Sequence, residues 1–200
     1  MFLNWNGKSR MFKSIFCFLA LSFSLLGFSS DHTTAERRAY PLHEAVSRLN
    51  LVEVERLLAT LGYSVDDVDD HGNTPLLYAA MEDSADTIKY LVAEGANIDF
   101  TNENGNKALH FAAMQGSADI IQYLVAEGAD INFTDKNGNT ALHFAVMCKS
   151  PAAIESLLSL GANYDARNEK GLKAEQLITI NHRIDGELVK ECLSIIEKRR

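Results

Sequence analysis

Histidine is the residue type in this sequence that is best suited to acid–base chemistry. His43, His110 and His143 each follow a leucine. An imidazole titrates near neutral pH, which makes it a candidate general acid or base. His143 follows His110 by 33 residues, and the residue 33 positions before His110 is Leu77. A leucine therefore occupies the place where a regular series would have a histidine. A site built from one recurring histidine would not lack it in one segment, so the pattern argues against catalysis.

A run of aspartates is the second candidate for chemistry. The run consists of Asp66, Asp67, Asp69 and Asp70. Carboxylate oxygens suit calcium, but the run lacks the spacing of an EF-hand loop. We expect a solvated acidic turn, with a cation site and a contact for a basic partner as alternatives. The sequence also contains no zinc, phosphate-loop, dinucleotide or protease signature. We therefore expect no cofactor, no metal and no enzymatic activity.

The composition is ordinary for a soluble globular protein, with 46% hydrophobic and 23% charged residues. The formal net charge is −8, and Lys8, Arg10 and Lys13 all precede the first acidic residue, Asp31. The chain from Asp31 onward is therefore more acidic still. Because an acidic surface repels phosphate groups, we expect neither a nucleic acid nor an anionic membrane surface as the partner.

The N-terminus has the layout of a secretory signal. Three basic residues precede an apolar run over 14–28, and the small residues Gly27, Ser29 and Ser30 close it. The run is short for a membrane span, which needs about 20 residues. We expect residues 1–30 to be a cleaved signal segment that starts at Met1 or Met11, with a linker over 31–37. An uncleaved membrane anchor and a buried structural helix are the alternatives.

Cleavage would place the protein outside the cytoplasm, either in the periplasm or secreted, and a membrane would be involved only if the segment stayed attached. It would also remove Cys17 and leave Cys148 and Cys192. These two cysteines fall in different parts of the repeat pattern described next. We therefore expect two free thiols, with a disulfide between them as the alternative.

The rest of the chain repeats itself with a 33-residue period. Columns in this register include Gly72, Gly105, Gly138 and Gly171; Gly95, Gly128 and Gly161; Leu76, Leu109 and Leu142; and Ile88, Ile121 and Ile154. Such self-similarity is the mark of a solenoid in which one supersecondary unit stacks on the next.

Each column has a structural purpose. The first glycine follows a polar residue, as in Asn137-Gly138, and such pairs occupy tight turns with positive φ. Thr74-Pro75 comes next and suits the N-cap and first position of a helix. A second helix carries its apolar residues at i, i+3 and i+4, and it ends at a glycine such as Gly95, placed for a left-handed C-cap. The unit is thus turn, helix, helix, turn.

The residues themselves resemble the ankyrin-repeat family. Asn-Gly-Asn-Thr-Ala-Leu-His-Phe-Ala at 137–145 is similar to its D-x-x-G-x-T-P-L-H-x-A-A signature, and Gly-Ala-Asp-Ile-Asn at 128–132 is similar to its G-A-D-V-N segment. The resemblance implies an α-helical repeat solenoid over 38–200, with regular repeats between degenerate N- and C-terminal caps. We place the repeats at 38–68, 69–101, 102–134 and 135–167, with a cap at 168–200.

The end repeats depart from the pattern. The first lacks the glycine turn and is one residue longer, with the extra residue expected near Thr60 and Leu61. The last breaks down after Gly171, and the tail from Arg183 to Arg200 is expected to form a closing helix. Polar, degenerate end repeats are what a solenoid needs, because their outer faces meet water.

The resemblance also implies roles for individual residues. The histidines in its T-P-L-H column bond backbone groups and tie adjacent repeats together. Positions that vary in the family face a concave groove, and there the chain has the apolar row Met81, Met114 and Met147, followed by Glu82 and Gln115. Apolar residues repeated on such a face suggest a docking surface.

Other residues add to this expected groove. The aromatic column Tyr78, Phe111 and Phe144 serves packing or partner contact, and Phe100 and Phe133 either extend the patch or fill space between hairpins. Asn104 and Asn137 belong to polar turn tips that would form its rim. We therefore expect a monomeric, non-catalytic scaffold that binds a partner protein. A membrane-tethered module, a secreted effector acting on host proteins and an enzyme are the alternatives.

Overall fold

The computed structural model of the chain describes residues 40–180 and 186–198. Within these ranges the chain forms helices joined by turns, with no β-strand and one isolated β-bridge between Arg167 and Lys173. The expected signal segment, 1–30, and linker, 31–37, lie outside the described residues. The predicted fold class, an α-helical repeat solenoid, is confirmed.

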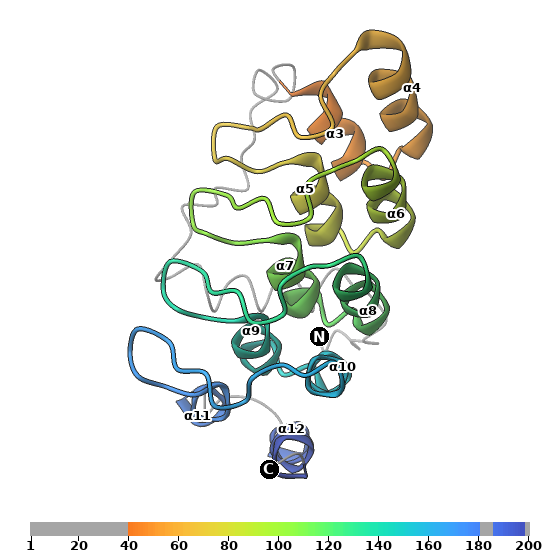
Figure 1. Ribbon diagram of the computed structural model, residues 1–200. Coiled ribbons are helices and arrows are strands. Elements are labelled where there is room, and N and C mark those ends of the chain that lie inside the picture. Colours follow the sequence, from red (N-terminus) through yellow and green to blue (C-terminus); the bar gives the residue numbers. More distant parts are fainter. Residues whose placement is uncertain (1–39, 181–185, 199–200) are drawn as a thin grey trace, which may run out of the picture. The chain divides into compact units, whose positions relative to one another are not determined.

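The helices come in consecutive pairs, each pair forming one repeat. Their bounds are α3 Pro41–Ser47 and α4 Leu51–Leu61; α5 Pro75–Met81 and α6 Ala85–Ala93; α7 Ala108–Gln115 and α8 Ala118–Ala126; α9 Ala141–Met147 and α10 Pro151–Ser159; α11 Ala174–Ile180 and α12 Gly186–Glu197. The first helices contact one another in the order α3, α5, α7, α9, α11, and α8, α10 and α12 do the same in a second row. Long turns connect each pair to the next and project to one side as hairpins (Figure 1).

The helices begin and end where the sequence pattern indicates. Thr74 caps α5 by accepting the Leu77 amide at its hydroxyl (3.4 Å), and Pro75 occupies the first turn. At the far end of the repeat, Gly95 takes a φ of +90° just past α6, and its amide donates to the Val92 carbonyl (3.0 Å). The predicted left-handed glycine ends are therefore confirmed.

The first repeat is longer than its neighbours, as predicted. Helix α4 has 11 residues, whereas α6, α8 and α10 have 9 each. Thr60 and Leu61 lie in its last turn, and Gly62 follows with a φ of +69°. The extra residue is therefore absorbed by helix length. At the other end of the stack, α12 provides the predicted closing helix and buries Cys192 and Ile196.

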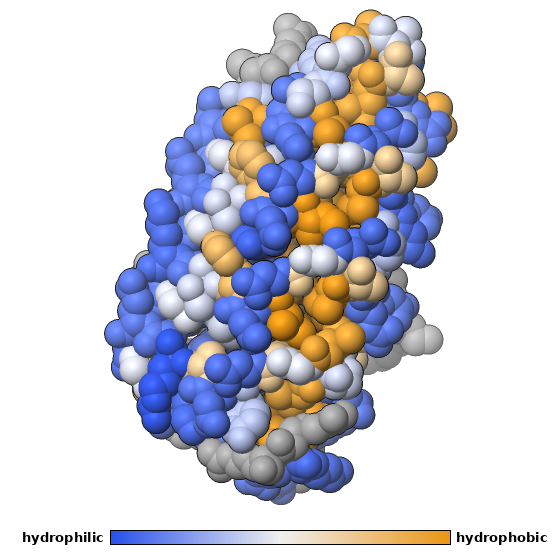
Figure 2. Space-filling view, in the orientation of Figure 1, coloured by the Kyte–Doolittle hydropathy of each residue, from blue (hydrophilic) through white to orange (hydrophobic). Residues whose placement is uncertain are grey.

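The core runs through the stack as columns of the 33-residue register. Leu76, Ile88 and Leu91 are fully buried, as are their counterparts in the next two repeats. Ala79 and Ala112 have no exposed surface, and their small side chains let successive first helices approach closely. Figure 2 shows hydrophilic atoms over the hairpins and a hydrophobic band along the helical part of the stack.

Each hairpin is held by one carboxylate or amide side chain that satisfies its backbone. Asp135 Oδ1 accepts the amides of Asn137 (2.9 Å) and Asn139 (2.7 Å). Asp69, Asn102 and Asn168 make the same pair of bonds in their own hairpins. An Asp or Asn side chain at this place therefore replaces the strand partner that a hairpin would otherwise supply.

Backbone bonds also join each hairpin tip to the next. The amides of Glu103, Lys136 and Glu169 donate to the carbonyls of His71 (3.1 Å), Asn104 (3.1 Å) and Asn137 (2.9 Å). This close approach of neighbouring tips, in addition to the positive φ, explains why the turns contain glycine. A Cβ on Gly138 would lie 2.8 Å from the Glu169 nitrogen, closer than the two atoms can pack.

The anchoring residue alternates between Asp and Asn along the stack, which the sequence analysis did not notice. Asn102 Nδ2 donates to Asn73 Oδ1 in the preceding hairpin (2.9 Å), and Asn168 Nδ2 donates to Asn139 Oδ1 (3.0 Å). Asp135 has no N–H to donate at the equivalent place. Asn106 occupies the same position in its hairpin as Asn73 and Asn139. Its Oδ1 is the one buried side-chain N or O atom of the described residues that has no hydrogen-bond partner.

Substitution of Asp135 by Asn should stabilise the protein. The new amide would keep the Oδ1 contacts, donate to Asn106 Oδ1 and remove a buried negative charge. We expect the free energy of unfolding, measured by urea titration, to rise by about 1 kcal/mol. The gain is net of two long bonds that the carboxylate accepts from Asn137 (3.3 Å) and Asn139 (3.2 Å).

Asp69→Asn is the matched control. An amide turns a donor toward two donors at both positions, but at Asp69 these are closer, Asn73 Nδ2 (3.1 Å) and the Tyr78 hydroxyl (2.8 Å), and no unpaired acceptor such as Asn106 Oδ1 offsets the loss. This variant should lose stability. Equal effects of the two substitutions would show that the unpaired Asn106 oxygen does not limit stability.

Candidate functional site

The recurring histidines lie between repeats and bond their backbones. The Nε2 atoms of His43, His110 and His143 lie 2.9, 3.1 and 3.1 Å from the carbonyl oxygens of Asn73, Phe133 and Leu172. Each of these carbonyls belongs to the turn segment that follows the histidine's own pair of helices. The expectation that these side chains tie adjacent repeats together is confirmed.

The other ring nitrogen is also occupied in two of the three. Nδ1 of His110 accepts the Lys107 amide (3.1 Å), and Nδ1 of His143 accepts the Thr140 amide (3.2 Å). An imidazole that accepts at Nδ1 and donates at Nε2 must be neutral. Burial accordingly lowers the pKa of all three histidines, and that of His110 falls to about 4. All three rings are buried inside the stack, so these imidazoles belong to its framework.

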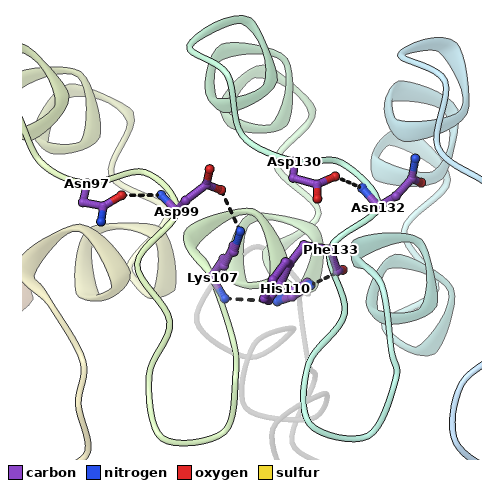
Figure 3. Close-up of polar contacts among 7 residues, drawn as sticks. All are labelled: Asn97, Asp99, Lys107, His110, Asp130, Asn132 and Phe133. Carbon is purple, nitrogen blue, oxygen red and sulfur yellow. Dashed lines mark hydrogen bonds and ion pairs between the residues drawn. The ribbon is translucent and has the colours of Figure 1, made fainter.

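A lysine replaces the N-cap threonine in the third repeat and builds a cluster that the sequence analysis missed. Lys107 is buried, and its Nζ lies 2.8 Å from Asp99 Oδ1 and 3.6 Å from the centre of the Phe133 ring (Figure 3). The ammonium is thus paired with a carboxylate and lies over an aromatic face. Lys173 pairs with Asp165 across the same eight-residue spacing (2.5 Å), and that recurrence was a usable signal.

Phe133 therefore fills space between hairpins. Its carbonyl receives the His110 ring, its own ring lies 6.2 Å from that imidazole, and Lys107 covers it (Figure 3). Of the two roles considered for this residue, the structure favours packing. Phe100 is partly buried as well, and its amide closes a turn onto the Asn97 carbonyl (3.2 Å).

The acidic run is used in local bonds. Asp66 accepts the Asn97 amide of the next repeat (3.0 Å), and Asp67 accepts the Ser64 amide (3.2 Å). Asp69 anchors its hairpin as described, and Asp70 accepts the Tyr40 hydroxyl (2.5 Å). No group of three or more potential metal ligands occurs among the described residues. The run therefore organises the first hairpin and the contact to its neighbour.

The methionine row is not uniformly accessible. Met81 and Met147 are partly exposed, whereas Met114 retains only 8% of its surface. Glu82, next to Met81, is exposed. Gln115 is partly buried, and its Nε2 donates to the Met81 carbonyl of the preceding helix. Successive first helices thus place these side chains in a row. Its apolar residues are accessible to solvent in the second repeat, at Met81, and in the fourth, at Met147.

The aromatic column lies deeper than the row. Phe111 and Phe144 retain 4% and 5% of their surface, and the Phe144 ring lies 5.4 Å from the His110 ring. Tyr78 is partly exposed and donates its hydroxyl to Asp69. The two phenylalanines therefore pack between helices, and Tyr78 is the member of the column that reaches the surface.

The two tip asparagines that the sequence analysis selected lie at the hairpin ends. Asn104 and Asn137 are partly buried, and the carbonyl of each accepts the amide of the following tip. Their amides donate to Asn102 and Asp135 within the same hairpin. Their backbones are thus fixed, whatever contacts their side chains make.

The cysteines differ from the expectation of two free thiols. Cys192 is free and buried, and burial raises the pKa of its thiol to about 11. That expectation is confirmed for Cys192, whereas Cys148 is disulfide-bonded in the full chain, and the expectation concerned the chain after removal of residues 1–30. A bond between the two is excluded because Cys192 is free.

Among the helices of the described residues, none combines the length and the apolar character that a membrane span requires.

Two comparisons with known proteins bear on this architecture. A family model described as ankyrin repeats (3 copies) matches residues 11–102 and 83–168. A comparison with curated proteins found no match.

The buried neutral histidines should make stability fall with acid. The pKa of His110 is lower in the folded chain, about 4, than its ordinary value of 6.5, so the unfolded chain binds more protons between these values. Stability is then full above pH 6.5 and is lost as the pH falls toward 4. We expect the free energy of unfolding to drop by roughly 2 kcal/mol between pH 7 and pH 5 from this residue alone.

His110→Leu tests the assignment, because Leu77 shows that the same column accepts leucine with 1% exposure. The variant should have a lower free energy of unfolding at pH 7, because the Lys107 backbone N–H and the Phe133 carbonyl lose their partner. Its unfolding free energy should nevertheless depend less on pH between 7 and 5 in urea titrations. An unchanged slope would place the acid sensitivity elsewhere.

Proposed function

The chain belongs to the ankyrin-repeat family, and we propose that it is a non-catalytic scaffold that binds a partner protein through one surface of the stack. Ankyrin repeats generally mediate protein–protein interaction. We call this the first-helix surface and define it by the exposed or partly exposed ends of the first helices and the neighbouring hairpin tips. Its residues are Tyr78, Met81, Glu82, Asn104, Gln115, Asn137 and Met147.

The observation that carries the proposal is the bonding between repeats. Backbone bonds join each hairpin tip to the next, as in Lys136 to the Asn104 carbonyl, and in three repeats an imidazole bond such as His110 to the Phe133 carbonyl adds to them. Side chains on corresponding positions are therefore held at fixed distances before any partner arrives. A preformed surface loses less conformational entropy on binding than a flexible one.

The composition of the surface suits a protein partner. Met81 and Met147 give it unbranched, adaptable apolar side chains, while Glu82, Asn104 and Asn137 are polar. An apolar centre with a polar rim is the usual anatomy of a protein interface. Met114, Phe111 and Phe144 are buried and are therefore left out of the docking surface, which has fewer residues than the sequence analysis selected.

Replacing Met81 and Met147 together by Glu should abolish capture of the partner. Both side chains are partly exposed, so the substitutions put two charges on the surface without burying them. We expect at least a tenfold loss of affinity in pull-down and titration experiments, with the urea midpoint little changed. Met114 is left unaltered because a charge at this buried site would destabilise the stack.

The control adds the same charges elsewhere. Ala93→Glu with Ala126→Glu changes two exposed residues at the ends of second helices. Partner capture should survive in this variant. Loss of capture in both, or in neither, would count against the first-helix surface.

We further propose that the protein is exported, on the basis of its N-terminal sequence. Lys8, Arg10 and Lys13 precede the apolar run over 14–28, and small residues follow it. The partner would then be a protein of the periplasm or of the extracellular space.

N-terminal sequencing of the protein recovered from cells tests export. We expect the mature chain to begin near Ser30 and to appear in the periplasmic or extracellular fraction. A chain that begins at Met1 or Met11 and stays with membranes would point to an anchor, and an intact chain in the soluble cell fraction would refute export.

A further inference from the structure

Charge is unevenly distributed along the first-helix surface and its tips. The exposed charges of the second and third repeats are acidic there: Asp70, Glu82 and Glu103. The fourth repeat instead exposes Lys136 at its tip, and the cap exposes Glu169 beside Lys170. In the first repeat Arg48 is exposed just past the end of α3 and pairs with Glu44 (2.6 Å), which leaves no net charge there. The surface is therefore most negative at the second repeat and loses that sign toward its C-terminal end.

Aromatic rings lie beside the acidic end. Tyr40 and Tyr78 both stand edge-on to the His43 ring, with centroids 5.5 and 5.3 Å from it. Their hydroxyls donate to Asp70 (2.5 Å) and Asp69 (2.8 Å). Both tyrosines are partly exposed. Two phenol rings and their carboxylates are thus fixed in one place by hydrogen bonds.

Glu82 belongs to the same neighbourhood. Burial raises the pKa of Tyr78 most, followed by the hydrogen bond to Asp69, and the charges of Asp69 and Glu82 and the nearby Tyr40 add to it. The Glu82 amide donates to the Tyr78 carbonyl (2.9 Å), which places the two residues side by side. Glu82 is exposed as a residue, but the protein atoms around its carboxylate displace part of its water and raise its pKa. No hydrogen bond or ion pair to this carboxylate occurs among the described residues. A cation at this place would supply the counter-charge that Glu82 lacks.

We propose that the partner presents a basic segment, rich in lysine or arginine, to the site formed by Tyr40, Asp70, Tyr78 and Glu82. This inference rests on the proposed function and specifies its partner. A cationic side chain would pair with Asp70 and Glu82 and lie against the tyrosine rings, an arrangement that favours ammonium and guanidinium groups. Lys136 repels the same segment, so the partner lies with its basic part toward the second repeat, where Asp70 and Glu82 are exposed.

The test uses the full chain and two ten-residue peptides as probes. Both peptides alternate leucine with a charged residue, which is lysine in one and glutamate in the other. We expect the lysine peptide to bind more tightly in calorimetric titration, with an affinity that falls as salt rises. Equal binding of the two peptides, or tighter binding of the glutamate peptide, would overturn the proposal.

Charge reversal then locates the site. Asp70→Lys with Glu82→Lys should weaken binding of the lysine peptide by about tenfold or more. The matched control is Asp86→Lys with Asp119→Lys, which changes the net charge equally at two exposed positions in the first turns of α6 and α8. Equal loss in both variants would reveal attraction to net charge alone and overturn the site.

A neutral variant guards against misfolding. If the urea midpoint of the reversed variant falls, Asp70→Asn with Glu82→Gln removes the charges and keeps the shapes. It should weaken binding of the lysine peptide by several-fold, and unchanged binding would overturn the proposal.

The two proposals can fail separately. If Met81→Glu with Met147→Glu abolishes partner capture while charge reversal changes neither capture nor peptide binding, the first-helix surface stands and the basic segment is refuted. If the methionine variant captures the partner normally while charge reversal abolishes lysine-peptide binding, the acidic site stands and the wider surface is refuted.

Discussion

The stack depends on hydrogen bonds that hairpin backbones make to side chains and to one another. A 33-residue unit of two short helices and a turn leaves peptide groups in the turn without strand partners. An Asp or Asn side chain accepts two of them, and a neutral imidazole from the preceding repeat pairs a third. Buried peptide groups without partners are costly, so this bonding and the apolar columns must form together.

The same constraint separates framework from surface. Residues that satisfy the turns, such as His143 and Asn139, have both ends of their side chains committed and cannot serve a partner. Residues at the ends of the first helices have no such duty, and there Met81 and Glu82 reach solvent. Because the framework is rigid, the character of the binding surface is set by a few side chains and by the order of their charges.

Much of this could be predicted from the sequence because the period is regular. Helix ends, the left-handed glycines and the extra length of the first repeat followed from the 33-residue register, and the role of the histidines followed from the resemblance to the ankyrin-repeat family. Burial within a column did not follow. Met81 and Met114 share a column, yet 8% exposure at Met114 depends on neighbours that periodicity does not describe. The pairing of Lys107 with Asp99 and Phe133 also requires knowledge of how one hairpin lies on the next.

The alternation of Asp and Asn at the hairpin anchors makes every second hairpin alike. An Asn hairpin donates backward to its predecessor, and an Asp hairpin does not, so hairpins 69–74 and 102–107 form one bonded couple and 135–140 and 168–173 another. Lys107 and Lys173 follow the same two-repeat order. Gain or loss of two adjacent repeats would preserve these couples, whereas loss of repeat 102–134 alone would bring Asp135 behind Asn73 and leave the Asn73 oxygen without its donor. The side-chain bonds between hairpins therefore recur every two repeats, twice the period visible in the sequence.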